Sequence, residues 1–421
     1  MIEINSENIF AINKKHGLSK SEFCAKSKFI KQYLQKIHAK KQDFYKTIDD
    51  NKTIISIKNF AKKNKGKFKD IVILGIGGSA LGAICIQQSL KHLFGKTATA
   101  TPKLHILDNI DPTLLTELEE VIDYKKTLFI VITKSGTTPE TITQYLYFRS
   151  KINTKKLDPK KHFIFITDPK TGILRQLANK EKIPSFDVPT NVGGRFSVLT
   201  AVGLLPAALI NINTDNLIVG ARKMRDKFFS TNFSQNLPFQ LATVQYLLGK
   251  KGKNINVLMP YSQKLIKFAD WYRQLLAESI GKERDNKGKI VNMGLTPINA
   301  LGVTDQHSQL QLFNEGPNDK LVIFIEVKNL GPKLQIPNKN LTFNKLLQIE
   351  KTATETSLTK NNRPNITITV DKVDEQTLGG LFMLFECGIA FLGEFFNINA
   401  FDQPGVEFSK KLTKDILKKL Y

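Results

Sequence analysis

The chain has few cysteines, and their scarcity limits the kinds of site it can contain. Cys24, Cys85 and Cys387 lie too far apart in sequence for a CxxC-type metal site. An odd number of cysteines also fits poorly with a disulfide framework. The first ten residues, MIEINSENIF, lack the basic stretch and apolar run of a secretory signal. We therefore expect a cytoplasmic protein in a reducing environment.

Arginine is also scarce, although the chain is strongly basic. It supplies eight of the 62 basic side chains, and the formal net charge is +24. Base readout and bidentate phosphate binding favour the planar guanidinium group over the lysine ammonium group. The densest basic run, 58–69, lacks the repeated alternation of basic and aromatic residues that single-strand binders use. We expect no nucleic-acid partner, although a diffuse positive field would attract an anionic sugar phosphate.

Membrane spans and metal motifs are missing as well. The apolar stretch 196–210 is short and contains Pro206, while 378–396 contains Glu386 and Glu394. Both stretches are predicted to be buried helices, and no membrane partner is expected. The sequence has no HExxH motif, no clustered His and Cys residues and no nucleotide P-loop. We expect neither a metal nor a cofactor.

The pattern of apolar runs predicts an α/β fold. At 421 residues and 41% hydrophobic content, the chain is long enough for two or three domains. Short apolar runs alternate with amphipathic stretches, which is typical of parallel sheets covered on both faces. The predicted strands are 71–74, 104–107, 128–132 and 163–166, then 256–259, 321–325 and 366–370. Helices are predicted within 216–248, 262–280 and 375–396.

These runs fall into two similar doubly wound lobes. We expect a helical N-terminal segment at 1–49 and a first α/β domain at 50–210. A second α/β domain at 211–400 and a helical C-terminal tail at 401–421 would follow. The tail carries a lysine that the motifs below single out.

A glycine-rich motif, GIGGSALG at 75–82, follows the first predicted strand. Gly75, Gly77, Gly78 and Ser79 would let backbone N–H groups approach an anion at the start of a helix. The motif also fits an ordinary tight turn or a dinucleotide fingerprint. The fingerprint requires an acid about 20 residues on, whereas Asp108 lies 33 residues after Gly75.

A second loop, TKSGTTPET at 133–141, follows the strand at 128–132. Thr133, Lys134, Ser135 and Thr138 offer hydroxyl groups and one ammonium group at a predicted helix start. Such a set could hold a phosphate. It could also be a Ser/Thr-rich helix cap, with Glu140 as the capping-box acid.

Two further motifs contain candidate catalytic residues. In QLLAESIGK at 274–282, Gln274 and Glu278 are four residues apart and share one helix face. A glutamate in apolar surroundings can serve as a base near neutral pH, although most glutamates are simply exposed. In NVGGRFS at 191–197, two glycines would let Arg195 approach an oxyanion. A loop arginine paired with a carboxylate is the alternative.

The remaining motifs are QHS at 306–308 and FDQPGVEFSK at 401–410. His307 stands in a polar, glutamine-rich setting, although an isolated histidine is usually structural or exposed. Gln403 and Lys410 are seven residues apart and can face the same way if a helix begins near Gly405. The alternative interpretation is that Lys410 belongs to a solvated basic helix.

Taken together and in this order, the motifs resemble the phosphoglucose isomerase family over roughly residues 50–415. The resemblance implies two sugar-isomerase (SIS) domains and reversible conversion of glucose 6-phosphate to fructose 6-phosphate. It implies that Glu278 transfers the proton, that Arg195 stabilises the enediolate, and that His307 with Lys410 opens the ring. It also implies a homodimer in which His307 reaches the neighbouring active site. The implied substrate-binding residues are Gly78, Ser79, Thr133, Lys134, Ser135, Thr138, Glu140, Gln274 and Gln403.

Two other functions remain possible from the residues. A SIS-type sensor would bind a sugar phosphate without turning it over, and would have no use for Glu278, His307 and Lys410 in their motifs. A nicotinamide-dependent dehydrogenase would use the GIGGSA turn and Asp108. An assay for fructose 6-phosphate formation tests the sensor, and a titration with NAD(P) tests the dehydrogenase.

Overall fold

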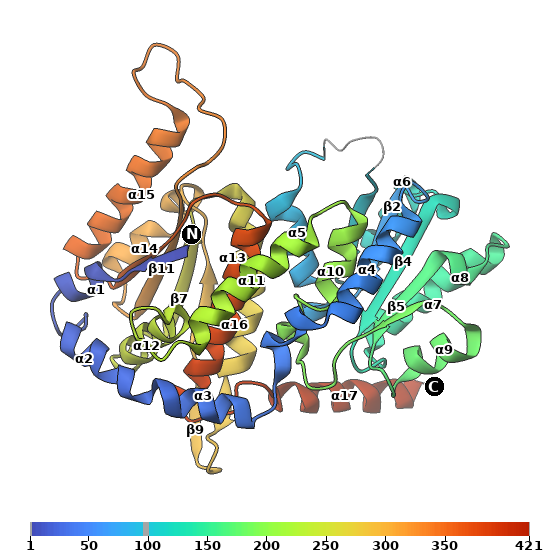
Figure 1. The fold of residues 1–421 in the computed structure, drawn as a ribbon, viewed down its shortest axis with the longest axis horizontal. Helices are drawn as coiled ribbons and strands as arrows, with labels where there is room; N and C mark the ends of the chain where they lie inside the picture. The colour runs from blue at the N-terminus through green and yellow to red at the C-terminus, as the bar shows by residue number, and fades with distance from the viewer. Residues whose placement is uncertain (1, 96–100, 421) are drawn as a thin grey trace.

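Two largely parallel sheets form the centres of two lobes in the computed structural model, which describes residues 2–95 and 101–420 (Figure 1). The first sheet has the order β3-β2-β4-β5-β6, and all neighbouring pairs are parallel. Its strands are β2 (Asp70–Leu74), β3 (Lys103–Leu107), β4 (Thr127–Thr133), β5 (Phe163–Thr167) and β6 (Ser185–Asp187). Because β3 lies on one side of β2 and β4 on the other, the strand order reverses between β2 and β4.

Helices cover both faces of the first sheet, as its continuous apolar strands require. β2 and β4 are buried along their whole length. One face packs against α4 (Asn51–Asn64), α5 (Leu81–Leu90) and α10 (Ala201–Leu209). The other packs against α6 (Pro112–Val121), α7 (Pro139–Thr154) and α9 (Ile173–Glu181), with the short α8 (Pro159–His162) before β5.

The second sheet repeats this arrangement in the order β1-β12-β11-β7-β10. Its strands are β1 (Ile2–Asn5), β7 (Ile255–Pro260), β10 (Thr296–Asn299), β11 (Lys320–Val327) and β12 (Asn365–Val370). One face is covered by α12 (Leu237–Lys250), α13 (Ile266–Ile280) and α16 (Glu375–Phe395), the last of which also packs against α11 (Thr214–Phe229). The other packs against α14 (Leu310–Glu315) and α15 (Phe343–Lys360). Two doubly wound lobes are thereby confirmed.

All seven predicted strands are present, whereas the shorter and more polar strands were missed. β6 and β10 are short edge strands without a long apolar run. β8 (Lys282–Arg284) and β9 (Ile290–Met293) form a small separate hairpin. β1 pairs antiparallel with β12, so the first residues of the chain belong to the second sheet. The rest of the N-terminal segment is helical, with α1 (Glu7–Ala11), α2 (Lys20–Cys24) and α3 (Ile30–Ala39).

Two predicted helices differ in extent from the observed ones. The helical region 216–248 divides into α11 and α12, and the Asn236 side chain accepts from the Phe239 amide at the start of α12. In the stretch 196–210, the helix α10 spans Ala201–Leu209 and contains Pro206. The residues before it form a turn that carries Arg195.

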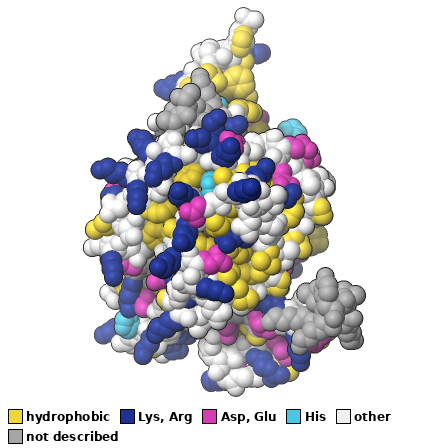
Figure 2. Space-filling model, turned by 90° about the vertical axis from the view of Figure 1, so that its right-hand side faces the viewer, with side chains coloured by type: hydrophobic (Ala, Val, Ile, Leu, Met, Phe, Trp, Pro, Cys, Tyr) yellow, Lys and Arg dark blue, Asp and Glu magenta, His cyan; other side chains and the backbone are white. Residues whose placement is uncertain are grey.

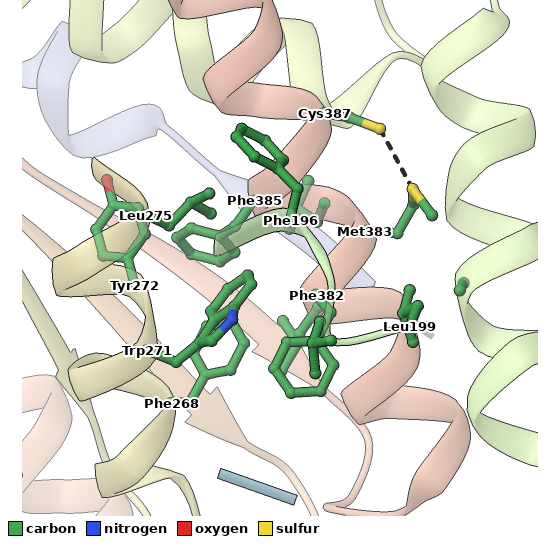
Figure 3. Packing of buried hydrophobic residues seen from close by; sticks show 14 of the residues in the cluster. Phe196, Leu199, Phe268, Trp271, Tyr272, Leu275, Phe382, Met383, Phe385 and Cys387 are labelled. Atoms are coloured by element: carbon green, nitrogen blue, oxygen red, sulfur yellow. Dashed lines mark hydrogen bonds between the residues drawn. The ribbon is translucent and has the colours of Figure 1, made fainter. Parts of the chain in front are cut away.

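α13 and α16 pack together between the two sheets. Phe268 and Trp271 of α13 face Phe382 and Phe385 of α16, with ring centroids 4.8–5.7 Å apart (Figure 3). α16 is long and apolar enough to cross a membrane, but its most apolar stretch is wholly buried inside the protein. It is therefore the buried helix that the sequence predicted. Because α13 is fixed in this core, Glu278, about two turns after Trp271, is held in place.

Candidate active site

The candidate site begins at the carboxyl ends of β2 and β4, where the strand order reverses. In open α/β sheets, ligands bind in the crevice outside the strands at such a reversal. The loop after β2 carries the GIGGSALG motif, and the loop after β4 carries TKSGTTPET. Leu74 and Val131 are paired at this end, so the two loops start side by side. The topology therefore brings together two motifs that are about 60 residues apart in sequence.

The β4 loop presents a compact cluster of hydroxyl groups. Thr133 Oγ1 lies 2.7 Å from Thr138 Oγ1 and 3.3 Å from Ser135 Oγ. Thr138 is the N-cap residue of α7, but its side chain makes no capping hydrogen bond. The capping-box interpretation of this loop is therefore wrong, because the hydroxyl group faces its neighbours in the loop instead of the helix amides.

Lys134 points away from this hydroxyl cluster. Its Nζ donates to the carbonyl oxygens of Thr190 and Val192, both at 2.8 Å. Burial lowers the pKa of Lys134, and the charge of Asp168 opposes that shift. The ammonium group therefore ties the β4 loop to the segment that leads into Arg195.

Arg195 is almost completely buried, with 1% of its side chain exposed. Its Nη1 donates to Glu278 Oε2 at 3.3 Å and to Gln403 Oε1 at 2.6 Å. Three further bonds reach Ser279 Oγ at 2.7 Å and the carbonyl oxygens of residues 400 and 402 at 2.7 and 3.0 Å. Burial lowers the pKa of Arg195, and the Glu278 carboxylate opposes this effect.

Glu278 and Gln274 lie on one face of α13, as their spacing predicted. Gln274 Nε2 donates to Glu278 Oε1 at 2.9 Å. The Glu278 side chain is 31% exposed, so its carboxylate is open on one side while fixed on two others. Glu278 is thus partly exposed but paired. Arg195 is paired with a carboxylate, as its alternative interpretation describes, and that carboxylate belongs to Glu278.

The glycines of the β2 loop allow close packing against this ion pair. A Cβ atom on Gly78 would lie 2.3 Å from the backbone of Gly194, next to Arg195. Gly77, with φ +59°, would bring a Cβ atom 2.9 Å from Gln274 Nε2. Ser79 follows, half-buried, in the short helical turn η4 (Gly77–Ser79). The glycine motif therefore allows close contact between protein segments.

A cavity of about 560 Å³ lies between the β4 loop and α17 (Gly405–Leu420). Ser135, Thr138 and Glu140 line one side, and Gln403 and Lys410 line the other. α17 runs along the first lobe, far in sequence from the loop it faces (Figure 1). Lys410 is exposed and donates to Glu407 Oε1 at 2.7 Å. Gln403, which lines this cavity, also accepts from Arg195, so one side chain joins the cavity wall to the Arg195–Glu278 pair.

His307 stands apart from these residues. It ends the turn η8 (Thr304–His307) and is exposed. Its neighbours are anchored: the Leu301 amide donates to Asp305 Oδ2 at 2.7 Å, and Tyr261 Oη donates to Gln306 Oε1 at 2.6 Å. In the described part of this chain, no hydrogen bond or ion pair joins His307 to another predicted site residue. His307 is therefore exposed at the end of a turn whose preceding residues are fixed by hydrogen bonds.

Several groups around Arg195 were not predicted from the sequence. They are the Ser279 hydroxyl, the carbonyl oxygens of Ala400 and Asp402, and the ammonium group of Lys282. Backbone carbonyls give no signal in a sequence. Lys282, however, closes the QLLAESIGK motif and could have been noticed there.

Other surface features lie away from this site. On the face shown in Figure 2, lysine and arginine side chains are interspersed with acidic and uncharged ones. A hollow of about 870 Å³ runs along α15 and is lined by none of the predicted site residues. Among the described residues, no group of three His, Cys, Asp or Glu side chains is placed to hold a metal.

Comparisons with known proteins give relatives of one kind. The family model for phosphoglucose isomerase matches residues 26–421. A glucose-6-phosphate isomerase from Carboxydothermus hydrogenoformans is 45% identical over 381 residues, 86% of this chain and 82% of that protein. A probable glucose-6-phosphate isomerase from Methanococcus maripaludis is 36% identical over 98% of this chain and 93% of that protein. The solved structure of a glucose-6-phosphate isomerase from Chlamydia trachomatis has a TM-score of 0.79 and 25% identity, covering 88% of this chain and 73% of that one.

Proposed function

This chain belongs to the phosphoglucose isomerase family, and from that premise we propose how its side chains interconvert glucose 6-phosphate and fructose 6-phosphate. The substrate is a phosphorylated hexose. Its phosphate binds at the β4 loop, and its reacting carbons lie at the Arg195–Glu278 pair. The contact that carries this proposal is the 3.3 Å approach of Arg195 Nη1 to Glu278 Oε2, with Gln403 on the same nitrogen.

Glu278 is the base in this assignment. It takes the proton from C2 of the open-chain aldose; the electron pair of that bond forms a C1=C2 double bond, and the π pair of the C1 carbonyl moves onto O1. The enediolate that results is stabilised by the Arg195 guanidinium, a fixed and buried cation. The hydroxyl proton on O2 passes to O1, Glu278 returns its proton to C1, and the electron pair on O2 forms the C2 carbonyl of the ketose. Gln274 supports this step because it holds one carboxylate oxygen in position.

The hydroxyl groups of Thr133, Ser135 and Thr138 bind the phosphate, next to the N-terminus of α7. Backbone amides at a helix start favour an anion, and hydroxyl groups can rotate to donate to its oxygens. Ser79 and Gly78 of the β2 loop, with Glu140 and Gln403, contact the sugar. Lys134 helps indirectly, because it fixes the loop to the segment before Arg195.

Lys410 and His307 open the sugar ring. Lys410 lines the cavity, whereas His307 faces outward on η8, so a second copy of the chain would have to supply the histidine. The proposed enzyme is therefore a cytoplasmic homodimer in which each active site contains residues of both chains. The exposure of His307 on an anchored turn supports this arrangement.

The substitution Glu278→Gln tests the proposal. It keeps the shape of the side chain but removes the base, and general-base catalysis is worth about 100- to 10,000-fold. The expected result is a loss of kcat in that range with unchanged thermal unfolding, measured by a coupled assay for glucose 6-phosphate formation. Glu283→Gln, on an exposed glutamate of β8, is the matched control. Near-normal turnover by folded Glu278→Gln enzyme would remove the assignment.

A further inference from the structure

Lys282 is a buried cation next to the proposed base. It is the first residue of β8, and 5% of its side chain is exposed. Its Nζ donates to the carbonyl oxygen of Glu278 at 2.6 Å and to that of Asp402 at 2.8 Å. Asp402 Oδ1 lies 3.5 Å away. The ammonium group is therefore surrounded by oxygens of two separate segments.

These two segments carry different parts of the site. The Glu278 carbonyl belongs to the last turn of α13, where carbonyl groups have no partner within the helix. The Asp402 carbonyl also accepts from Arg195 Nη2 at 3.0 Å, and the next residue, Gln403, accepts from Nη1. Lys282 thus joins the end of the base-bearing helix to the segment that holds Arg195 and leads into α17.

A cation at this position is costly to the fold. Burial, and then the neighbouring charge of Arg195, lowers the pKa of Lys282, while Asp402 opposes the shift. Replacing a buried ion by a well-packed apolar group is often neutral or stabilising, provided that no partner is left unpaired. A role in fixing the relative position of two functional segments accounts for an ammonium group that bridges them.

We propose that Lys282 is a positioning residue for the isomerase reaction, which sets the Glu278 carboxylate relative to Arg195 and Gln403 by clamping the end of α13 to residues 400–403. This inference rests on the proposed role of Glu278. A shift of about 1 Å in a reacting group can lower a rate about 100-fold. Lys282 does not reach the hydroxyl groups of the β4 loop, so the phosphate end of the site should be insensitive to it.

The test compares Lys282→Met with Lys282→Arg in the full-length enzyme. We expect kcat to fall roughly 10- to 100-fold in Lys282→Met. The inhibition constant of inorganic phosphate should stay within about twofold, because the β4 loop is intact. Lys282→Arg, which restores a donor cation, should recover most of the lost kcat.

Lys320→Met is the matched control. Lys320 is as buried as Lys282, at 7% exposure for each residue, and it also donates to a backbone carbonyl, that of Pro317. Its loss should lower the thermal unfolding midpoint without changing kcat. If Lys282→Met does not fold, Lys282→Gln carries the same expectations.

Two results would overturn the inference. One is a folded Lys282→Met or Lys282→Gln enzyme whose kcat stays within twofold of the parent. The other is an equal loss of kcat and of phosphate inhibition, which indicates general damage to the site. Glu278→Gln is assayed alongside: if it stays active, the proposed function itself fails, whereas an inactive Glu278→Gln with an active Lys282→Met removes the positioning role alone.

Discussion

Arg195 organises the site as a single residue. Its five N–H groups are all used, on three side chains and two carbonyl oxygens. The longest of these bonds is the one to Glu278, at 3.3 Å. A substrate oxygen could replace this bond on Nη1 at the smallest cost in hydrogen-bond energy, because the other four bonds are shorter. The guanidinium thus stays fixed while one of its donors faces the reaction.

Arg195→Lys should therefore inactivate the enzyme although the charge is kept. An ammonium group cannot reproduce five donors in a planar fork. Removing one donor to a developing oxyanion costs about 100- to 1,000-fold in kcat, and we expect a loss of at least that size in the coupled assay.

Arg273→Lys provides the control, since Arg273 lies on the same helix with 57% of its side chain exposed. It should leave kcat unchanged. If folded Arg195→Lys retained kcat within a few-fold of the parent, the role of the guanidinium would be contradicted.

How far the sequence predicts these residues depends on the kind of group. Arg195, Glu278 and Gln274 stand in recognisable motifs, and the structure brings them together. The direction of Lys134 could not be predicted, because it depends on the carbonyls of Thr190 and Val192, which carry no sequence signal.

At the level of one helix, α16 contains a carboxyl group, that of Glu386, in an apolar environment. Glu386 is completely buried, and neither of its oxygens has a hydrogen-bond partner among the described residues. Burial raises the pKa of Glu386 well above its ordinary value of 4.5. The carboxyl group therefore binds a proton more tightly in the folded protein than in the unfolded chain.

Glu386→Met should stabilise the protein, because it removes an unsatisfied polar group from an apolar site. The expected gain in unfolding free energy is about 1–3 kcal/mol. A pKa raised by folding makes stability fall as pH rises above the unfolded value. The difference in thermal unfolding midpoint should therefore be larger at pH 8 than at pH 5.

Glu386→Gln is the control, because it removes the titration but keeps a polar group. Its pH profile should flatten with a smaller gain in stability. An equal or lower midpoint for Glu386→Met at pH 8 would show that the carboxyl group is satisfied by some other interaction.

Among the strands, the sequence predicted the buried ones and the edge strand β3, and missed the other edge strands. β2, β4 and β11 are nearly continuous apolar runs because both faces of the sheet are covered. β1 and β10 lie at opposite edges of the second sheet and are partly polar. Their strand character comes from a long-range partner, which local patterns do not reveal.

The whole molecule consists of two lobes with the candidate site at their junction. Arg195 comes from the first lobe, Glu278 from the helix between the lobes, and Gln403 from the segment before α17. The domain limits at residues 49, 210 and 400 stay predictions. Because β1 pairs with β12, the first residues of the chain belong to the second sheet, although the predicted limits place them in a separate N-terminal segment.

A homodimer with shared sites predicts complementation between two inactive variants. In a mixed dimer of Glu278→Gln and His307→Asn chains, one site carries both substitutions and the other carries neither. We expect each variant alone to be nearly inactive, and the mixed dimer, formed by co-expression, to recover up to about half of the parent activity per dimer. No recovery in verified mixed dimers would place His307 outside the neighbouring site.

The most direct test of the whole account is a crystal structure of the Glu278→Gln enzyme with bound fructose 6-phosphate. The account predicts the phosphate on the hydroxyl groups of Thr133, Ser135 and Thr138, with C1 and C2 beside residue 278 and the Arg195 guanidinium. A phosphate bound elsewhere, or sugar carbons far from residue 278, would contradict it.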